Sequence, residues 1–230
     1  METVLITGAN RGIGLELAAR YAAAGNRVFA CCRDPKKADR LQALAQSHKS
    51  LSVHGVHVAD GKSVAALAAT LTEPIDILIN NAGMPGPAPD KQSLANMDFD
   101  GWAETFAVNT MAPLRMVQAF RRNLKAGKNA RAITITSQMG ALSLNMPVMF
   151  AYCSSKAAVN KVMNMASVEL ANDGITVGLI HPGWVRTDMG GKNADLSVED
   201  SAAGIMATIA KWTPAETGGF KKWNGETHGW

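Results

Sequence analysis

A β-rich run leads directly into a glycine-rich segment at residues 3–14, which read TVLITGANRGIG, and a helical pattern follows through Ala23. The glycines stand in a G-x-x-x-G-x-G pattern. Strand, glycine loop and helix form the context of a phosphate-binding turn, because glycines permit a tight turn and the helix N-terminus offers free N–H groups to a pyrophosphate. A plain turn is the alternative. We expect a dinucleotide to contact Gly8, Asn10, Arg11, Gly12, Ile13 and Gly14.

Apolar runs and helical patterns alternate along the rest of the chain. The continuously apolar run Ile75–Ile79 is typical of a strand in a parallel sheet that is buried on both faces. We expect residues 1–230 to form a single α/β domain, a Rossmann-type doubly wound parallel sheet of about seven strands with helices on both faces. The further strands are expected at Asn26–Cys32, Leu51–Val58, Arg131–Thr136, Ile175–Ile180 and Gly219–Trp223, and the main helices at Lys36–Gln46, Ser63–Leu71, Asp100–Lys125, Phe150–Asp173 and Val198–Trp212.

Composition excludes several classes of protein. Hydrophobic residues make up 47% of the chain and charged residues 18%, which fits a buried globular core and not a disordered chain. The net charge of +4 comes without any run of more than two Lys or Arg, so no nucleic-acid partner is indicated. Three cysteines form neither a disulfide framework nor a metal-ligand spacing, so no metal is expected. With no signal peptide or membrane span indicated, we expect a cytoplasmic protein.

The segment Arg33-Asp34-Pro35 follows the second expected strand, where dinucleotide-binding folds select their cofactor. An acidic residue there holds the ribose hydroxyl of NAD, and an arginine pairs with the 2′-phosphate of NADP. Asp34 has another role to play, since Asp before Pro is a typical helix N-cap. That leaves Arg33, together with Arg11 from the glycine loop, to meet a phosphate. NADP(H) is therefore favoured, with NAD(H) possible.

Two further segments end expected strands. Asp60 follows the third strand, where its carboxylate would accept a hydrogen bond from an adenine amino group or would cap the next helix; the pattern leaves both open. Asn81, Ala82 and Gly83 follow the fourth strand, at the edge where open α/β sheets bind ligands.

Tyr152 and Lys156 stand four residues apart in a segment of helical composition, so both can face one cavity. A free phenol titrates near ~10, and a neighbouring cation would lower its pKa and make tyrosine a usable general acid or base. The alternative is an amphipathic-helix tyrosine beside a solvated lysine.

Together the glycine loop, the run Asn80-Asn81-Ala82-Gly83 and the Tyr152-x-x-x-Lys156 pair resemble the short-chain dehydrogenase/reductase family, over residues 1 to about 190. The stretch 181–191, HPGWVRTDMGG, and the tail 224–230 are similar to its C-factor and sniffer-like carbonyl reductase branch.

The resemblance implies roles for four residues. Tyr152 would donate a proton, Lys156 would lower its pKa and hold the nicotinamide ribose, and Ser137 of Ser137-x-x-Gly140 would hydrogen-bond the substrate oxygen. Asn109 would anchor a water in the proton relay. Pro113 cannot donate to the carbonyl of Asn109, which independently predicts a disturbed helix there. The interval from Ser137 to Tyr152 is about two residues longer than usual for the family, which enlarges the loop 142–150.

The turn after the sixth strand would pass the nicotinamide, with contacts from Pro182, Gly183, Val185 and Thr187. Thr187 would bond the carboxamide. A short substrate lid is expected near residues 188–200. His181 lacks a visible partner, and we interpret it as structural and not as a catalytic base.

Methionines recur near the expected pocket, and flexible thioethers with an indole suit a bulky apolar or aromatic ketone. Packing in the core or at a subunit interface is the alternative. The candidate pocket residues are Met84, Met139, Met146, Met149, Trp184 and Met189.

The sequence thus predicts an NADP(H)-dependent oxidoreductase that transfers a hydride between nicotinamide and a carbonyl or secondary alcohol. The rival hypothesis is a C-factor-type protein that binds NAD(P) as a signalling or regulatory ligand with little turnover. An epimerase or dehydratase would usually need a larger substrate domain. The helices Asp100–Lys125 and Phe150–Asp173 resemble the family's dimerising pair, so a homodimer or homotetramer is expected.

Overall fold

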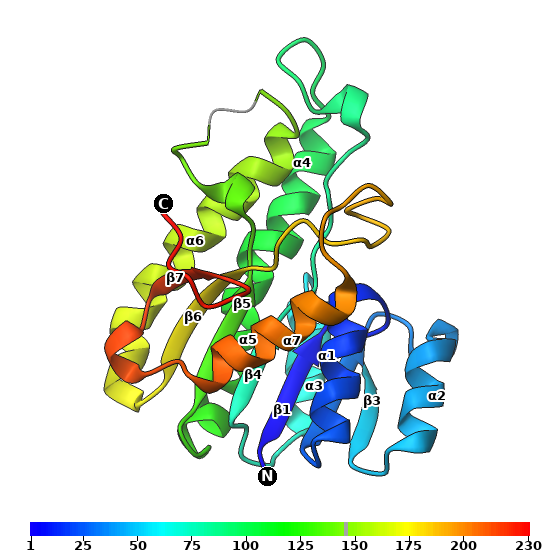
Figure 1. Cartoon of the computed structure of the whole chain (residues 1–230), viewed down its shortest axis with the longest axis vertical. Coiled ribbons are helices and arrows are strands. Elements are labelled where there is room, and N and C mark those ends of the chain that lie inside the picture. The colour runs from blue at the N-terminus through cyan, green and yellow to red at the C-terminus, as the bar shows by residue number, and fades with distance from the viewer. Residues whose placement is uncertain (145–146) are drawn as a thin grey trace.

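The computed structural model describes residues 1–144 and 147–230 and forms a three-layer α/β structure (Figure 1). Its seven parallel strands lie in the order β3-β2-β1-β4-β5-β6-β7. The strands are β1 (Thr3–Thr7), β2 (Arg27–Cys32), β3 (Leu51–Gly55), β4 (Ile77–Asn80), β5 (Arg131–Ile135), β6 (Thr176–His181) and β7 (Gly219–Lys222). The expected fold class and strand number are confirmed.

The order of the strands reverses between β1 and β4, so the carboxyl ends of these two strands open a crevice. The helices are α1 (Gly12–Ala23), α2 (Asp39–Ser47), α3 (Gly61–Thr70), α4 (Phe99–Phe106), α5 (Ala112–Lys125), α6 (Phe150–Leu170) and α7 (Val198–Ala210). None of the helices in the described residues is long and apolar enough to cross a bilayer.

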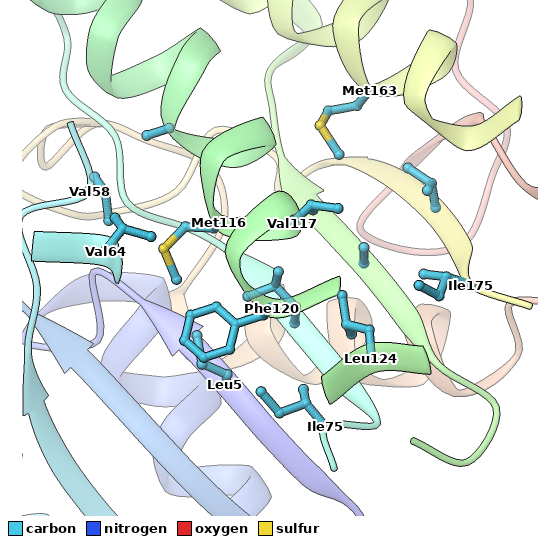
Figure 2. Packing of buried hydrophobic residues seen from close by; sticks show 14 of the residues in the cluster. Leu5, Val58, Val64, Ile75, Met116, Val117, Phe120, Leu124, Met163 and Ile175 are labelled. Atoms are coloured by element: carbon cyan, nitrogen blue, oxygen red, sulfur yellow. The ribbon is translucent and has the colours of Figure 1, made fainter. Parts of the chain in front are cut away.

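Two apolar cores cover the two faces of the sheet. One packs α3, α5 and α6 onto the sheet, and Figure 2 shows Phe120 and Met116 of α5 over Leu5 of β1. The other packs α1, α2 and α7 and includes the buried indole of Trp212. The strands are apolar on both faces because helices cover both, as the continuous apolar runs predicted.

The structure corrects several expected boundaries. The helix expected at Asp100–Lys125 is interrupted by a π-helical turn at Ala107–Met111, which contains Asn109 and ends before Pro113. Asp98 and not Asp100 caps its start, since the Asp98 carboxylate accepts from the backbone N–H of Gly101 at 2.9 Å.

Asp34 caps a 3₁₀ turn, Pro35–Lys37, and α2 begins only at Asp39. The third strand ends at Gly55 instead of Val58.

Candidate active site

The glycine loop packs closely against the end of β4. The Asn81 amide donates to the carbonyls of Thr7 and Gly8 at 3.0 and 3.1 Å, and the Thr7 hydroxyl accepts from the backbone N–H of Asn81 at 3.0 Å. A Cβ at Gly14 would lie 2.3 Å from the carbonyl oxygen of Gly8. Only glycine fits there, and the backbones of β1 and β4 meet at the crevice.

Helix α1 begins at Gly12 with a free N-terminus. Its N-cap, Arg11, makes no side-chain capping bond, and the first turn has no acidic residue. Gly12 has φ +51°, and a Cβ there would lie 3.3 Å from a methyl carbon of Thr187. The uncapped N–H groups and the absent Cβ atoms match what the pyrophosphate of a dinucleotide requires.

The two arginines expected at the 2′-phosphate differ in surroundings. Arg11 forms an ion pair of 2.9 Å with Asp188, and the two side chains are 62% and 75% exposed. Arg33 is exposed and forms no ion pair within the described residues. Asp34 caps its turn through a bond to the backbone N–H of Lys36, as expected. Asp60 is exposed and caps α3 by accepting from the N–H of Lys62, so the capping role is confirmed, and the adenine contact stays a prediction.

Lys156 is buried near the end of β5. Its ammonium donates to the carbonyl of Ile135 at 2.9 Å and lies 5.8 Å from the centroid of the Tyr152 ring. A Cβ at Gly83 would lie 3.7 Å from the Lys156 Nζ and 3.3 Å from the Asn109 Oδ1. Gly83, Asn109 and Lys156, far apart in the sequence, therefore meet at one point.

Ser137 is buried where β5 ends, and its hydroxyl is near enough to Tyr152 to lower the pKa of that phenol. The Ser137 hydroxyl accepts from the backbone N–H of Met139 at 3.1 Å, so the capping role weighed as an alternative is present, and the substrate-binding role stays a prediction. A Cβ at Gly140 would lie 2.6 Å from the backbone carbon of Lys156. The Ser137-x-x-Gly140 turn therefore packs closely against α6, the helix that carries Tyr152.

Burial controls both titrating groups. It lowers the pKa of Lys156 to about 8. Burial also raises the pKa of Tyr152, and the hydrogen bond from Ser137 opposes that rise. The net pKa of Tyr152 is raised and not lowered, because loss of water around the phenol is the largest cause of the shift; the expected effect of Lys156 on the phenol stays a prediction.

The Asn109 side chain makes three hydrogen bonds. Its amide oxygen accepts from the N–H of Met84 at 2.9 Å, and its amide nitrogen donates to the carbonyl of Met84 at 2.9 Å and to the Ser155 hydroxyl at 3.0 Å. The acceptors that remain for a water near Asn109 are the second lone pair of its amide oxygen and its backbone carbonyl, to which Pro113 cannot donate.

Comparison with known proteins agrees with this geometry. Residues 2–196 match the family model described as short chain dehydrogenase. The chain belongs to the short-chain dehydrogenase family.

Three relatives illustrate the similarity. C-signal of Myxococcus xanthus is 38% identical over 160 residues, which cover 69% of this chain and 95% of that protein. The structure of the NADPH-bound carbonyl reductase from chicken fatty liver is 33% identical, with a TM-score of 0.91 and coverage of 100% and 99% of the two chains. The carbonyl reductase Sniffer of D. melanogaster is 30% identical, with a TM-score of 0.92 and full coverage of both chains. This short-chain dehydrogenase is accordingly an oxidoreductase, and the resemblance to the C-factor and sniffer-like branch is confirmed.

Hydrogen bonds and close packing hold the turn after β6 in place. Val185 is buried and pairs with Leu196 in an isolated parallel bridge. Ser201 donates to the carbonyl of Pro182 at 2.7 Å, and a Cβ at Gly183 would lie 2.8 Å from a methyl carbon of Leu196. The hydroxyl of Thr187 accepts from the N–H of Gly190 at 3.0 Å. Helix α7 begins at Val198, so it includes the last residues of the segment 188–200, whose role as a lid stays a prediction.

The candidate pocket residues lie on four segments. Met84 follows β4, Met139 lies in the turn after Ser137, and Met149 precedes α6 in a left-handed conformation at φ 49°. Trp184 and Met189 lie in the segment after β6, where the indole donates to the carbonyl of Gly190 at 2.8 Å. Met146 lies outside the described residues. His181 is buried at the end of β6 and stacks edge-on against His228, and burial lowers its pKa to about 4.

Residues that sequence reasoning missed connect these parts. Thr7 ties the glycine loop to β4, and Ser155 and Thr110 join α6 to the π-helical turn, with the Thr110 hydroxyl donating to the carbonyl of Ser155 at 2.9 Å. Gln92 joins the loop after β4 to the backbone of Tyr152. Ser155 lay inside the quoted Tyr152–Lys156 motif, but Gln92 has no local signal.

A lysine whose pKa falls on folding makes stability depend on pH. The pKa of Lys156 is about 8 in the folded protein, against an ordinary value of 10.5. Between those values the unfolded state binds more protons, so the Lys156 contribution to the free energy of unfolding should rise with pH by up to about 3 kcal/mol. The difference in the free energy of unfolding between the wild type and Lys156→Met, measured by urea unfolding, should rise across this range, because the buried thiols and phenols, whose raised pKa values lower stability as pH rises, are present in both proteins. Parallel curves for both proteins would contradict the assignment.

Proposed function

We propose that this protein is an NADP(H)-dependent carbonyl reductase that interconverts a ketone or aldehyde and an alcohol. The observation that carries the proposal is the convergence of Ser137, Tyr152 and Lys156 at the carboxyl end of β5, beside Gly83 of the nucleotide crevice. The carbonyl reductases of chicken fatty liver and of D. melanogaster, which match over the whole chain, support the same reaction class.

Ser137 and Tyr152 have separate roles in carbonyl reduction. When bound, the reduced nicotinamide would supply the hydride. The hydroxyl of Ser137 donates a hydrogen bond to the substrate oxygen, and Tyr152 gives that oxygen a proton. Burial keeps the pKa of Tyr152 above its ordinary value, so the phenol is protonated at neutral pH, which is the form a proton donor needs.

Lys156 stabilises the phenolate once the proton has left. Its ammonium has three donors, and one of them is used by the carbonyl of Ile135. The remaining donors are available for the nicotinamide ribose and for a water chain, in which the backbone carbonyl of Asn109 takes part. A pKa of about 8 leaves Lys156 charged at neutral pH.

The cofactor is held by the glycine loop, with Gly8, Asn10, Gly12, Ile13 and Gly14 at the pyrophosphate. Arg33 and Arg11 meet the 2′-phosphate of NADP. The Arg11–Asp188 pair does not oppose this assignment, because exposed ion pairs contribute only about 0–1 kcal/mol and a phosphate carries about −2 charges. Asp60, Asn81, Ala82, Gly83, Pro182, Gly183, Val185 and Thr187 complete the proposed cofactor site.

A bulky apolar or aromatic ketone is the substrate class we favour. Trp184 and Met189, after β6, are about half exposed, and Met84, Met139 and Met149 are half-buried. Thioethers and an indole bind apolar surface without demanding polar partners.

A second function, an NAD(P)-binding signalling protein with little turnover, draws support from the 38% identity to C-signal. The two functions differ in a measurable way. A signalling protein would bind the nucleotide without needing Tyr152, whereas a reductase needs the phenol for every turnover.

Removing the Tyr152 hydroxyl tests the proposed mechanism. In Tyr152→Phe, turnover with NADPH and an aromatic ketone should fall by about 10²–10⁴, because general acid catalysis is lost, while NADPH affinity should stay nearly unchanged. Tyr21→Phe is a matched control, since Tyr21 is the other tyrosine and lies buried in α1. Near-normal turnover in Tyr152→Phe, measured as loss of nicotinamide absorbance, would contradict the mechanism.

Cofactor choice is tested at Arg33. In Arg33→Ala, the Kd for NADPH should rise by about 10- to 100-fold, because a charge-assisted hydrogen bond to phosphate is lost, while the Kd for NADH should not change. Arg20→Ala removes an arginine from α1 that pairs with Glu16 and serves as the control. Equal effects on both cofactors, measured by fluorescence titration, would contradict the phosphate assignment.

We also propose a homo-oligomer that packs through α5 and α6. Met165 and Val168 of α6 are 60% and 74% exposed and lie three residues apart, on one side of the helix. An adjoining groove of about 230 Å³ is lined by Thr110, Met111, Leu114, Arg115, Gln118 and Val162. An apolar face of this kind is typical of a surface that is covered by a partner.

Sedimentation tests this arrangement. The wild type should sediment as a dimer or tetramer, and Met165→Glu should shift it toward the single subunit, because the charge would be buried in the interface. Leu94→Glu places the same charge on a loop residue that is 93% exposed and should leave the mass unchanged. A single-subunit mass for the wild type would overturn the oligomer.

A further inference from the structure

We propose that Gln92 is a positioning residue for the reaction: it caps helix α6 from a distant loop and thereby sets the place of Tyr152. This inference rests on the proposed function, because it assigns a role in presenting the phenol. Gln92 lies in the loop between β4 and α4, which Figure 1 shows beside α4 at the end of the molecule where the strands' carboxyl ends point. Its side chain is only 2% exposed.

Helix α6 lacks a cap of its own. Met149, at the N-cap position, has a left-handed backbone with φ 49° and makes no side-chain capping bond. The N–H groups of the first turn then need acceptors from elsewhere. Tyr152 is the third residue of the helix, the position whose N–H a capping side chain normally binds. The Gln92 Oε1 accepts from this N–H at 3.3 Å.

The same amide holds its own loop together. The Nε2 of Gln92 donates to the carbonyl of Pro85 at 3.1 Å and to the carbonyl of Pro87 at 2.6 Å. Both hydrogens of the amide are thus used inside the loop, and the oxygen is left for α6. Gln92 also pairs with Met97 in an antiparallel bridge.

The backbone of the loop is built around this side chain. Gly86 has φ +88°, and a Cβ there would lie 3.0 Å from the Gln92 Oε1 and 3.1 Å from its Nε2. Proline fixes φ on either side of Gly86. Asn109 of the π-helical turn makes two hydrogen bonds to the backbone of Met84, where the loop begins, and Gln92 binds the first turn of α6. The loop is thus tied at two points, to the π-helical turn and to α6.

A shift of the first turn of α6 would move the phenol relative to Ser137, and small displacements of a proton donor lower turnover sharply. Gln92 therefore acts on the reaction through the backbone of Tyr152, without touching substrate or cofactor.

The test compares Gln92→Leu with Asn123→Leu. Asn123 is a matched carboxamide that donates to two loop carbonyls, those of Leu71 and Glu73, each at 2.8 Å, at the other end of the sheet. In Gln92→Leu, the Tyr152 amide should exchange with deuterium roughly tenfold faster by NMR, and kcat should fall about tenfold or more with nearly unchanged NADPH affinity. Asn123→Leu should lower stability but leave both quantities unchanged.

Unchanged Tyr152 exchange in Gln92→Leu, or an equal loss of kcat in Asn123→Leu, would overturn the positioning role. If the wild type reduces no ketone, the proposed function fails, and the amide exchange still decides whether Gln92 caps α6.

Discussion

The buried ammonium of Lys156 is the constraint around which the site is arranged. A cation removed from water is unstable unless nearby groups stabilise it, and here the carbonyl of Ile135 accepts one of its hydrogens. No carboxylate contributes to its shifted pKa in the described part of the chain; burial alone lowers it to about 8. An incompletely compensated cation strongly favours any anion that forms beside it, and the phenol of Tyr152 is the group in position to become one.

Rigidity around that cation comes from interlocked backbone and side-chain contacts. Asn109 in the π-helical turn bonds the backbone of Met84 twice and the hydroxyl of Ser155 once, which joins the loop after β4 to α6. The turn containing Gly140 presses on the backbone of Lys156. Reactions that need a donor within a fraction of an ångström depend on such support, because the entropy of ordering has been lost during folding and not at each turnover.

Sequence reasoning succeeded where a local pattern has one physical meaning. Alternating apolar runs and helices predicted the parallel sheet, and Pro113 four residues after Asn109 predicted the helix disturbance that the π-helical turn embodies. It failed where tertiary packing decides: the Arg11–Asp188 pair joins residues 177 positions apart, and Gln92 looks like an ordinary loop residue. The direction of the Tyr152 pKa shift was likewise missed, because burial of the phenol, the largest cause of the rise, follows from tertiary packing and not from local sequence.

The central claim is that these residues reduce a carbonyl with NADPH, and wild-type turnover tests it most directly. Purified protein with NADPH and a panel of ketones, from small charged compounds to bulky aromatic ones, would be followed by the decay of nicotinamide absorbance. We expect turnover that is faster with NADPH than with NADH and greatest for the apolar and aromatic ketones. Tight NADPH binding with no turnover across the panel, or turnover of small charged substrates alone, would contradict it.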